Sequence, residues 1–187
     1  MTYEEAITDF DRLNEDDKVK EVYAHFGLAV YYAQVLEQQS INMIAANKQC
    51  EGNIIDEKGV EALWDEYDLG SRTFGKLIFE LKSLYNFSEE DQRELKVVLK
   101  LRNYIAHNYF RINAELFYSN SGQKRMIKDF IEFQQKAGNL DKKLIKYLRV
   151  YTDKIGLTQE QIEKIMEQTK KTWSEKIVNE DYVTITK

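Results

Sequence analysis

The sequence contains no proline, only one cysteine and eight glycines among its 187 residues. Proline is common in turns and loops, so its absence indicates long helices joined by short connections. The lone cysteine, Cys50, cannot form a disulfide within the chain and cannot build a cysteine-rich zinc site. This cysteine usage is typical of a reducing compartment, and we expect a cytoplasmic protein.

Long hydrophobic runs are also missing. No uninterrupted apolar stretch reaches the roughly 18 residues that a transmembrane helix needs, so the sequence predicts no membrane span. The N-terminus is acidic and lacks the apolar core of a signal peptide. Leu, Lys, Glu, Gln, Ala and Ile, which are fair to good helix formers, are abundant. The composition therefore predicts an all-α protein.

Apolar residues at spacings of three and four divide the chain into expected helices. Their ranges are 2–13, 18–48, 57–67, 73–85, 89–107, 123–137, 141–155 and 158–177, with a continuing or bent helix over 110–117 and turns at 68–71 and 119–122. We expect an up-and-down helical bundle over residues 1–138. Gly138 and Asn139 should stop or bend a helix, which leaves residues 139–187 as a helical extension and tail packed on the same domain. The tail over 181–186 alternates like a strand, and we expect it to be disordered or to add a strand to another chain.

Charge is distributed unevenly along the chain. Residues 1–91 have a balance of −12, residues 92–128 have a balance of +6, and residues 129–187 have a balance of +1. A basic segment in an acidic protein is a candidate phosphate-binding surface. Solvated helix faces are also commonly charged. Lys96, Lys100 and Arg111 are the candidate phosphate-binding residues of the basic segment.

The stretch Leu-Arg-Asn-Tyr-Ile-Ala-His-Asn-Tyr at residues 101–109 closes the most amphipathic helix. On a regular helix, Val98, Leu101 and Ile105 fall on one side, and the Arg, Asn, His and Tyr fall along the other. Asn103 and His107 are four residues apart and can touch. Arg102 lies about 140° from His107, so a straight helix does not bring the two together.

Arg-Asn, three residues, His, one residue and Tyr resembles the motif of the HEPN superfamily. These proteins are small helical bundles of four to five core helices, and they carry the motif at the end of a late helix. The form with a Tyr two residues after the His is similar to that of HEPN toxins paired with nucleotidyltransferase antitoxins. The resemblance covers residues 18–135.

The resemblance implies a metal-independent endoribonuclease, without a cofactor, that acts as a homodimer with two motifs facing one cleft. It implies a toxin or phage-defence effector. His107 would be general base or acid in attack by the ribose 2′-OH, since a His titrates near neutral pH. Arg102 would stabilise charge on the phosphate, and Asn103 would orient His107 or the phosphate. The expected products are 2′,3′-cyclic phosphate and 5′-hydroxyl ends.

Tyr109 has two interpretations. It is either a structural aromatic residue beside the site or, by analogy with the toxin–antitoxin pairs, a hydroxyl that a nucleotidyltransferase-type antitoxin modifies with an adenylyl group. Modification would place a bulky anion in the cleft.

The alternative function is a non-catalytic module of the same fold that holds RNA or a protein partner. A His near a helix C-terminus also interacts well with the helix dipole, so the motif is compatible with ordinary capping.

The sequence has no phosphate-binding glycine loop, and two His residues are too few for a usual zinc site. An acidic cluster, Glu61, Asp65, Glu66 and Asp68, could hold a cation but is more typical of a solvated face.

Overall fold

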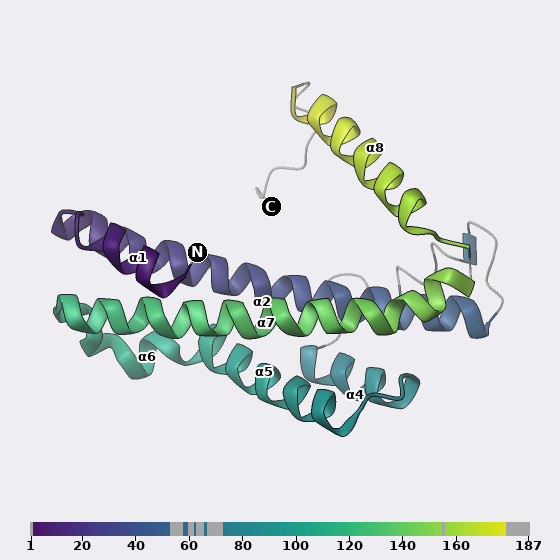
Figure 1. The fold of residues 1–187 in the computed structure, drawn as a ribbon, viewed down its shortest axis with the longest axis horizontal. Helices are drawn as coiled ribbons and strands as arrows, with labels where there is room; N and C mark the ends of the chain where they lie inside the picture. The colour runs from purple at the N-terminus through teal and green to yellow at the C-terminus, as the bar shows by residue number, and fades with distance from the viewer. Residues whose placement is uncertain are drawn as a thin grey trace.

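The structure is a computed structural model that describes residues 2–52, 58–59, 62, 66, 73–154 and 156–178. Every element in these residues is helical, which confirms the all-α bundle (Figure 1). The elements are α1 (Tyr3–Phe10), α2 (Glu15–Glu51), α4 (Phe74–Leu84), α5 (Glu89–His107), α6 (Tyr109–Asn113), the 3-10 helix η1 (Ala114–Tyr118), α7 (Asn120–Lys154) and α8 (Gln159–Val178). No described helix is long and apolar enough to cross a membrane.

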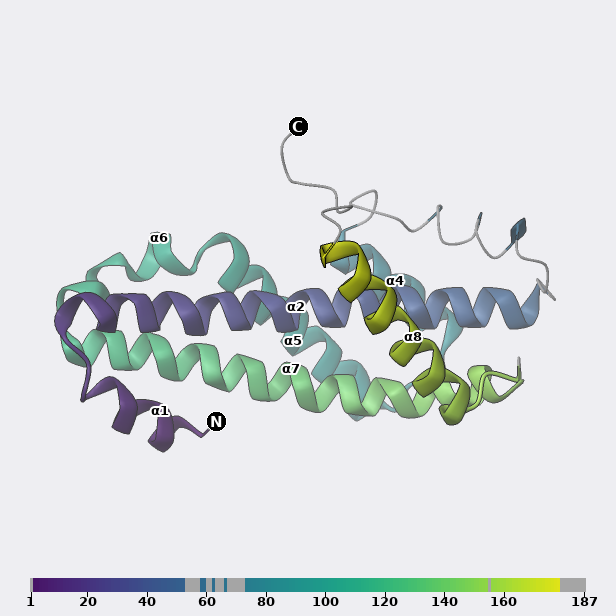
Figure 2. The same cartoon turned by 90° about the horizontal axis from the view of Figure 1, so that it is seen from above.

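Two long helices, α2 and α7, form the frame of the bundle. They lie side by side and run in the same direction, while α5 runs against them (Figures 1 and 2). Their contact buries Phe130, Phe133 and Leu140 of α7 together with Ala29 and Leu36 of α2. Burial of these apolar side chains is the main stabilising contribution to a helical bundle.

The helix boundaries follow local capping chemistry. Ser88 caps α5 by accepting a hydrogen bond from the Asp91 N–H, and Thr73 caps α4 in the same way. Thr158 and Gln161 exchange hydrogen bonds in the capping box expected for α8. Asn14 caps α2, which begins three residues before the expected start at residue 18.

The predicted break at Gly138 and Asn139 is wrong, because α7 is one continuous helix of 35 residues. An interior glycine costs a helix about 1 kcal/mol relative to alanine. Here Ala137 and Leu140 are buried on either side of the glycine, and this packing outweighs the cost. The boundary proposed between residues 1–138 and 139–187 therefore falls inside α7.

The predicted turn at residues 119–122 is also replaced by helix, since α7 begins at Asn120. Gly122 permits the close approach of α7 to η1, because a Cβ there would overlap the Leu116 carbonyl. Gly156, which follows the expected helix over 141–155, has a φ of 75°, which favours glycine.

The last helix, α8, extends away from the bundle (Figure 1). Its side chains are exposed over residues 159–172 except for a half-buried Ile162. The expected helix at 57–67 and the tail at 181–186 fall almost wholly outside the described residues.

Candidate functional site

The motif lies where α5 ends and the chain bends. His107 is the last residue of α5, and Asn108 leaves the helical conformation with φ −130° and ψ −20°. The Asn108 N–H still donates to the Tyr104 carbonyl oxygen at 2.9 Å, so the α5 hydrogen-bond ladder is complete to its last turn. The chain then enters α6 in a new direction.

Arg102 points into the bundle. Its Nη2 forms a short ion pair with Glu37 of α2, and its guanidinium lies 5.9 Å from the centre of the Phe74 ring of α4. The Arg102 side chain is 20% exposed, and its buried Nε has no hydrogen-bond partner. Nη1 donates to Asn103 Oδ1 at 3.2 Å. Arg102 thus connects α2, α4 and the exposed Asn103.

His107 and Asn103 lie on the exposed side of α5. Lys96 and Lys100 are also exposed, and the spacing 96, 100, 103, 107 places all four on one stripe of the helix. We call these four residues the α5 stripe. No hydrogen bond or ion pair joins a side chain of Lys96, Lys100 or His107 to another described residue. The stripe presents two cations and an imidazole to solvent.

Arg111, the third candidate RNA-binding residue, is exposed on α6. Its Nη2 donates to Asn108 Oδ1 at 2.6 Å. It therefore lies just beyond the end of the α5 stripe and helps hold the bend after His107.

Tyr109 is almost fully buried, with 1% of its surface exposed. Its hydroxyl donates to Asp129 Oδ2 on α7 at 2.8 Å. Burial, and then the hydrogen bond with Asp129, raises the pKa of the Tyr109 hydroxyl far above its usual value. The ring packs on Phe130 with centroids 4.6 Å apart. These contacts favour the structural interpretation of Tyr109.

A pocket of about 490 Å³ lies between α5, α6, η1 and α7. Its lining includes Leu101, Tyr104, Tyr109, Asp129 and Lys136. Asp129 already accepts from Tyr109 and pairs with Arg125 Nε at 3.0 Å. His107 and Asn103 do not line this pocket, so the pocket and the α5 stripe are separate features.

The prediction that the polar motif residues share one face is wrong in two respects. Arg102 is turned inward toward Glu37, and Tyr109 is buried on α6 after the bend at Asn108. A helical projection assumes that the helix continues, and it does not say which neighbouring helix a polar side chain meets. Val98 and Ile105 are buried as predicted.

Sequence reasoning missed Glu37, the partner of Arg102. One signal was present, because Glu37 is the only charged residue between Glu21 and Lys48. A single carboxylate in a long apolar helix requires a partner when the helix is packed. Asp129, the partner of Tyr109, gave no comparable signal, since charged residues are frequent along α7.

Within the described residues, no three His, Cys, Asp or Glu side chains gather into a group that could hold a metal ion. Of the acidic cluster, only Glu66 falls in the described part of the chain. His25, the other histidine, is 4% exposed, and burial lowers the pKa of its imidazole.

Comparison of the chain with protein-family models, with curated proteins and with solved structures finds no match.

Proposed function

We propose that the protein is a HEPN-like, metal-independent endoribonuclease that acts as a homodimer and leaves 2′,3′-cyclic phosphate and 5′-hydroxyl ends. The supporting observation is the α5 stripe, in which an exposed His107 follows Lys96, Lys100 and Asn103 along one side of a helix. The resemblance of residues 102–109 to the HEPN motif supplies the reaction type, and it also suggests a toxin or phage-defence role.

The α5 stripe suits the backbone of RNA. Lys96 and Lys100 are neighbours on one face, and they can bind successive phosphates without first breaking an ion pair with another described residue. Contacts of this kind position a nucleic acid without reading its sequence. His107 would then lie about two turns beyond Lys100 and about three turns beyond Lys96, at the end of the helix.

The chemistry needs a group that moves protons and a group that stabilises negative charge. An exposed imidazole can accept the proton of the 2′-OH or donate one to the leaving 5′-oxygen. The nucleophile, leaving group and phosphate all belong to the RNA, so no cofactor is required. Asn103, which Arg102 holds through its Nη1, would orient the phosphate or the imidazole.

In this proposal Arg102 holds Asn103 in place and also binds the phosphate. Glu37 fixes the guanidinium, and the remaining donors of the fork can bind a non-bridging phosphate oxygen. In a dimer, this phosphate can be the one that the ribose 2′-OH attacks while His107 of the second copy accepts the 2′-OH proton.

The test is RNA cleavage in the presence of a chelator, with analysis of the product ends. We expect cyclic-phosphate ends with the wild type and a loss of about 10²-fold or more in rate with His107→Ala, the range for removing a general acid or base. RNA that stays intact with the wild type would contradict the proposal. If His107→Ala cleaves RNA as fast as the wild type, His107 is not the general acid or base.

A matched pair of lysines tests the stripe separately. Lys100 and Lys142 are both exposed helical lysines, on α5 and α7. We expect Lys100→Ala to weaken RNA binding and to reduce its salt dependence by about one phosphate contact, with no effect from Lys142→Ala. Equal effects of the two variants would indicate a diffuse electrostatic attraction instead of a defined surface.

The alternative, a non-catalytic module that holds RNA or a protein, is favoured by the Arg102–Glu37 ion pair. A guanidinium neutralised within its own chain is less suited to stabilise charge in a transition state. In that case RNA would bind to the α5 stripe and stay intact. The Glu37→Gln variant discriminates the two, since it frees Arg102 and should raise the cleavage rate only if Arg102 is a charge-stabilising group.

A further inference from the structure

The exposed side of α2 lacks the charge that such a surface usually carries. From Val22 to Leu36 the sequence contains no Asp, Glu, Lys or Arg. One side of this stretch is core, with Val22, Ala29 and Leu36 buried. On the other side, Tyr23 is 53% exposed, Leu28 is 44% exposed and Tyr31 is 58% exposed. Tyr23 also packs on Phe110 and Phe117 of its own chain, so Leu28 and Tyr31 are the apolar side chains of this face that a partner could cover.

The other long helix shows what a solvated face looks like in this protein. The exposed residues of α7 include Arg125, Glu132, Lys136, Lys142, Lys146 and Arg149. The uncharged stretch of α2 is therefore a local feature and does not reflect the composition of the chain. In Figure 2, α6 and α7 lie on either side of the N-terminal half of α2, and no helix of the described residues is drawn in front of it.

The exposed residues of α2 form a regular seam. Lys20, Ala24, Gly27, Tyr31, Gln34 and Gln38 are all exposed and follow one another at alternating intervals of four and three residues. We call these six residues the α2 seam. This interval is the a and d spacing through which two helices pack as a coiled coil. The seam lies on the side of α2 opposite its buried residues.

The order of small and large residues along the α2 seam identifies its occupant. Ala24 and Gly27 come first, and Tyr31 and Gln34 follow. Suppose that a second α2 packs antiparallel against the seam, with the two-fold axis at the height of Ala29 along the helix. Gly27 of one copy then faces Tyr31 of the other. Ala24 then faces Gln34, so a small residue meets a large one at the central layers, and Lys20 faces Gln38 at the outer layers. A parallel pair would instead place Tyr31 against Tyr31 and Gly27 against Gly27.

We propose that the α2 seam is the surface through which two copies of this chain pair, antiparallel and centred on Ala29. Isologous pairing about a two-fold axis requires such a self-complementary surface. The identity of the partner rests on the proposed function, which needs a second copy. The location and register rest on the exposure and residue order of α2.

The seam adjoins the end of α5 that carries the motif. Arg102 pairs with Glu37 of α2, and Phe110 packs on Phe26 with centroids 4.6 Å apart. Residues 102–110 therefore lie alongside residues 26–37 of α2. Pairing through the seam brings the motif-bearing ends of two copies to one side of the dimer.

Gly27→Arg tests the surface. A Cβ at Gly27 has no heavy atom within 4 Å, so the folded chain has room for a side chain. Replacing a helical glycine should also strengthen the helix. We expect the variant to keep its circular dichroism while sedimentation shows a monomer over a dilution series in which the wild type is a dimer. Asn139→Arg, exposed on α7, is the control and should stay dimeric.

Cysteine cross-linking tests the register, in chains that carry Cys50→Ser. We expect a mixture of Ala24→Cys and Gln34→Cys chains to form a disulfide between one chain of each kind. Either variant alone should not cross-link, because residues 24 of two antiparallel copies would lie roughly 15 Å apart along the axis, beyond the reach of a disulfide.

A monomeric wild type, a dimeric Gly27→Arg variant, or cross-linking of Ala24→Cys with itself would each overturn the proposal. RNA is absent from both experiments. A dimer that pairs through the seam but leaves RNA intact would therefore refute the ribonuclease alone, and a monomer that cleaves RNA would refute the interface alone.

Discussion

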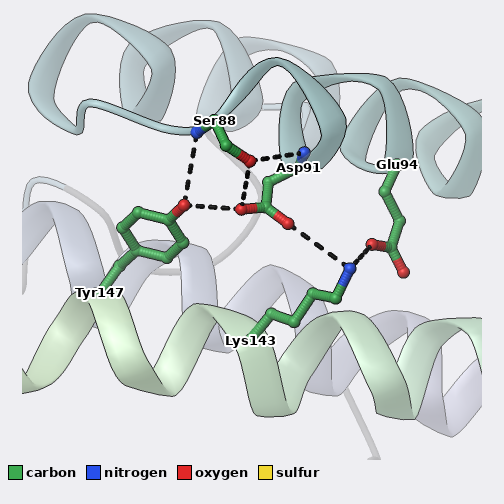
Figure 3. A network of polar contacts seen from close by, with 5 residues as sticks. All are labelled: Ser88, Asp91, Glu94, Lys143 and Tyr147. Carbon is green, nitrogen blue, oxygen red and sulfur yellow. Dashed lines mark hydrogen bonds and ion pairs between the residues drawn. The ribbon is translucent and has the colours of Figure 1, made fainter.

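The two ends of α5 use their polar side chains in opposite ways. At the N-terminal end, Ser88, Asp91 and Glu94 form a network with Lys143 and Tyr147 of α7 (Figure 3). The Tyr147 hydroxyl donates to Asp91 at 2.6 Å, and the Ser88 hydroxyl donates to it at 2.7 Å. At the C-terminal end, His107 has no such partner among the described residues.

This difference separates polar side chains that are satisfied within the fold from polar side chains that remain in contact with solvent. Polar groups that satisfy one another hold two helices in register and have little capacity left for a ligand. Side chains that stay solvated retain their hydrogen-bonding capacity for a ligand. Arg102 stands between the two cases, because Glu37 holds one side of its guanidinium while its Nε lacks a partner.

The largest expected effect belongs to Arg102→Ala. If the proposed function holds, the variant removes a donor that stabilises charge on the phosphate, and RNA cleavage should fall by about 10²-fold or more. It also leaves Glu37 without its partner in a mostly buried position, which should lower the free energy of unfolding by about 1–3 kcal/mol. Cleavage assays and urea unfolding measure the two effects. Arg149→Ala, on an exposed arginine of α7, should change neither.

Asp91→Asn should affect stability and leave cleavage unchanged. The hydrogen bond from Tyr147, then that from Ser88 and then Lys143 lower the pKa of the Asp91 carboxyl. Hydrogen bonds to a charged group contribute about 1.5–3 kcal/mol, and we expect a loss near the lower limit because the Asn retains some of them.

The pH dependence of this effect has a definite sign. A carboxyl with a depressed folded-state pKa contributes stability above its ordinary value of 3.8, and this contribution is lost as the pH falls through the folded-state value. The difference in unfolding free energy between wild type and Asp91→Asn should therefore shrink below about pH 4. A difference that is constant with pH would show that the charge of Asp91 is not the cause.

Tyr109→Phe should produce a smaller change, and it distinguishes the two interpretations of this residue. Loss of the hydrogen bond to Asp129 should cost about 1 kcal/mol of unfolding free energy, because Asp129 keeps Arg125 as a partner. Cleavage should be unchanged if the tyrosine is structural. Tyr118→Phe, on a ring that is 88% exposed, should have no effect. Intact mass would show an adenylyl group on the wild type and its absence from Tyr109→Phe if the modification occurs.

The smallest expected effect concerns His25. Burial lowers the pKa of its imidazole below the ordinary value of 6.5, and the opposing influence of Glu21 is smaller. The neutral imidazole is therefore favoured by the fold, and its stabilising contribution is lost as the pH falls below about 6.5. His25 ring resonances followed by NMR should titrate below the usual range. Titration of His25 above that range would show that Glu21 dominates over burial.

Much of the fold could be predicted from the sequence because helix ends are local. The range 89–107 was predicted for α5, and the structure gives the same bounds, with Ser88 as the cap and acidic residues in the first turn. The break at Gly138 could not be judged in this way, because its outcome depends on packing between α7 and α2. Where propensity and tertiary burial disagree, burial decides.

The site was predictable only in part. The exposure of Asn103 and His107 follows from the period of α5 and agrees with the structure. The inward turn of Arg102 depends on Glu37, which is 65 residues away in the sequence, and the Tyr109 hydroxyl is satisfied by Asp129 on another helix, 20 residues away. Neither partner leaves a local pattern in residues 101–109.

The sequence by itself determined that the chain is helical, where most helices begin and which sides of α5 are apolar, because these properties depend on residues within one or two turns. Only the tertiary structure decided which polar side chains are held inside and which remain free. Whether a polar group is satisfied depends on the neighbour that another helix places against it, and that neighbour is set by packing over the whole bundle.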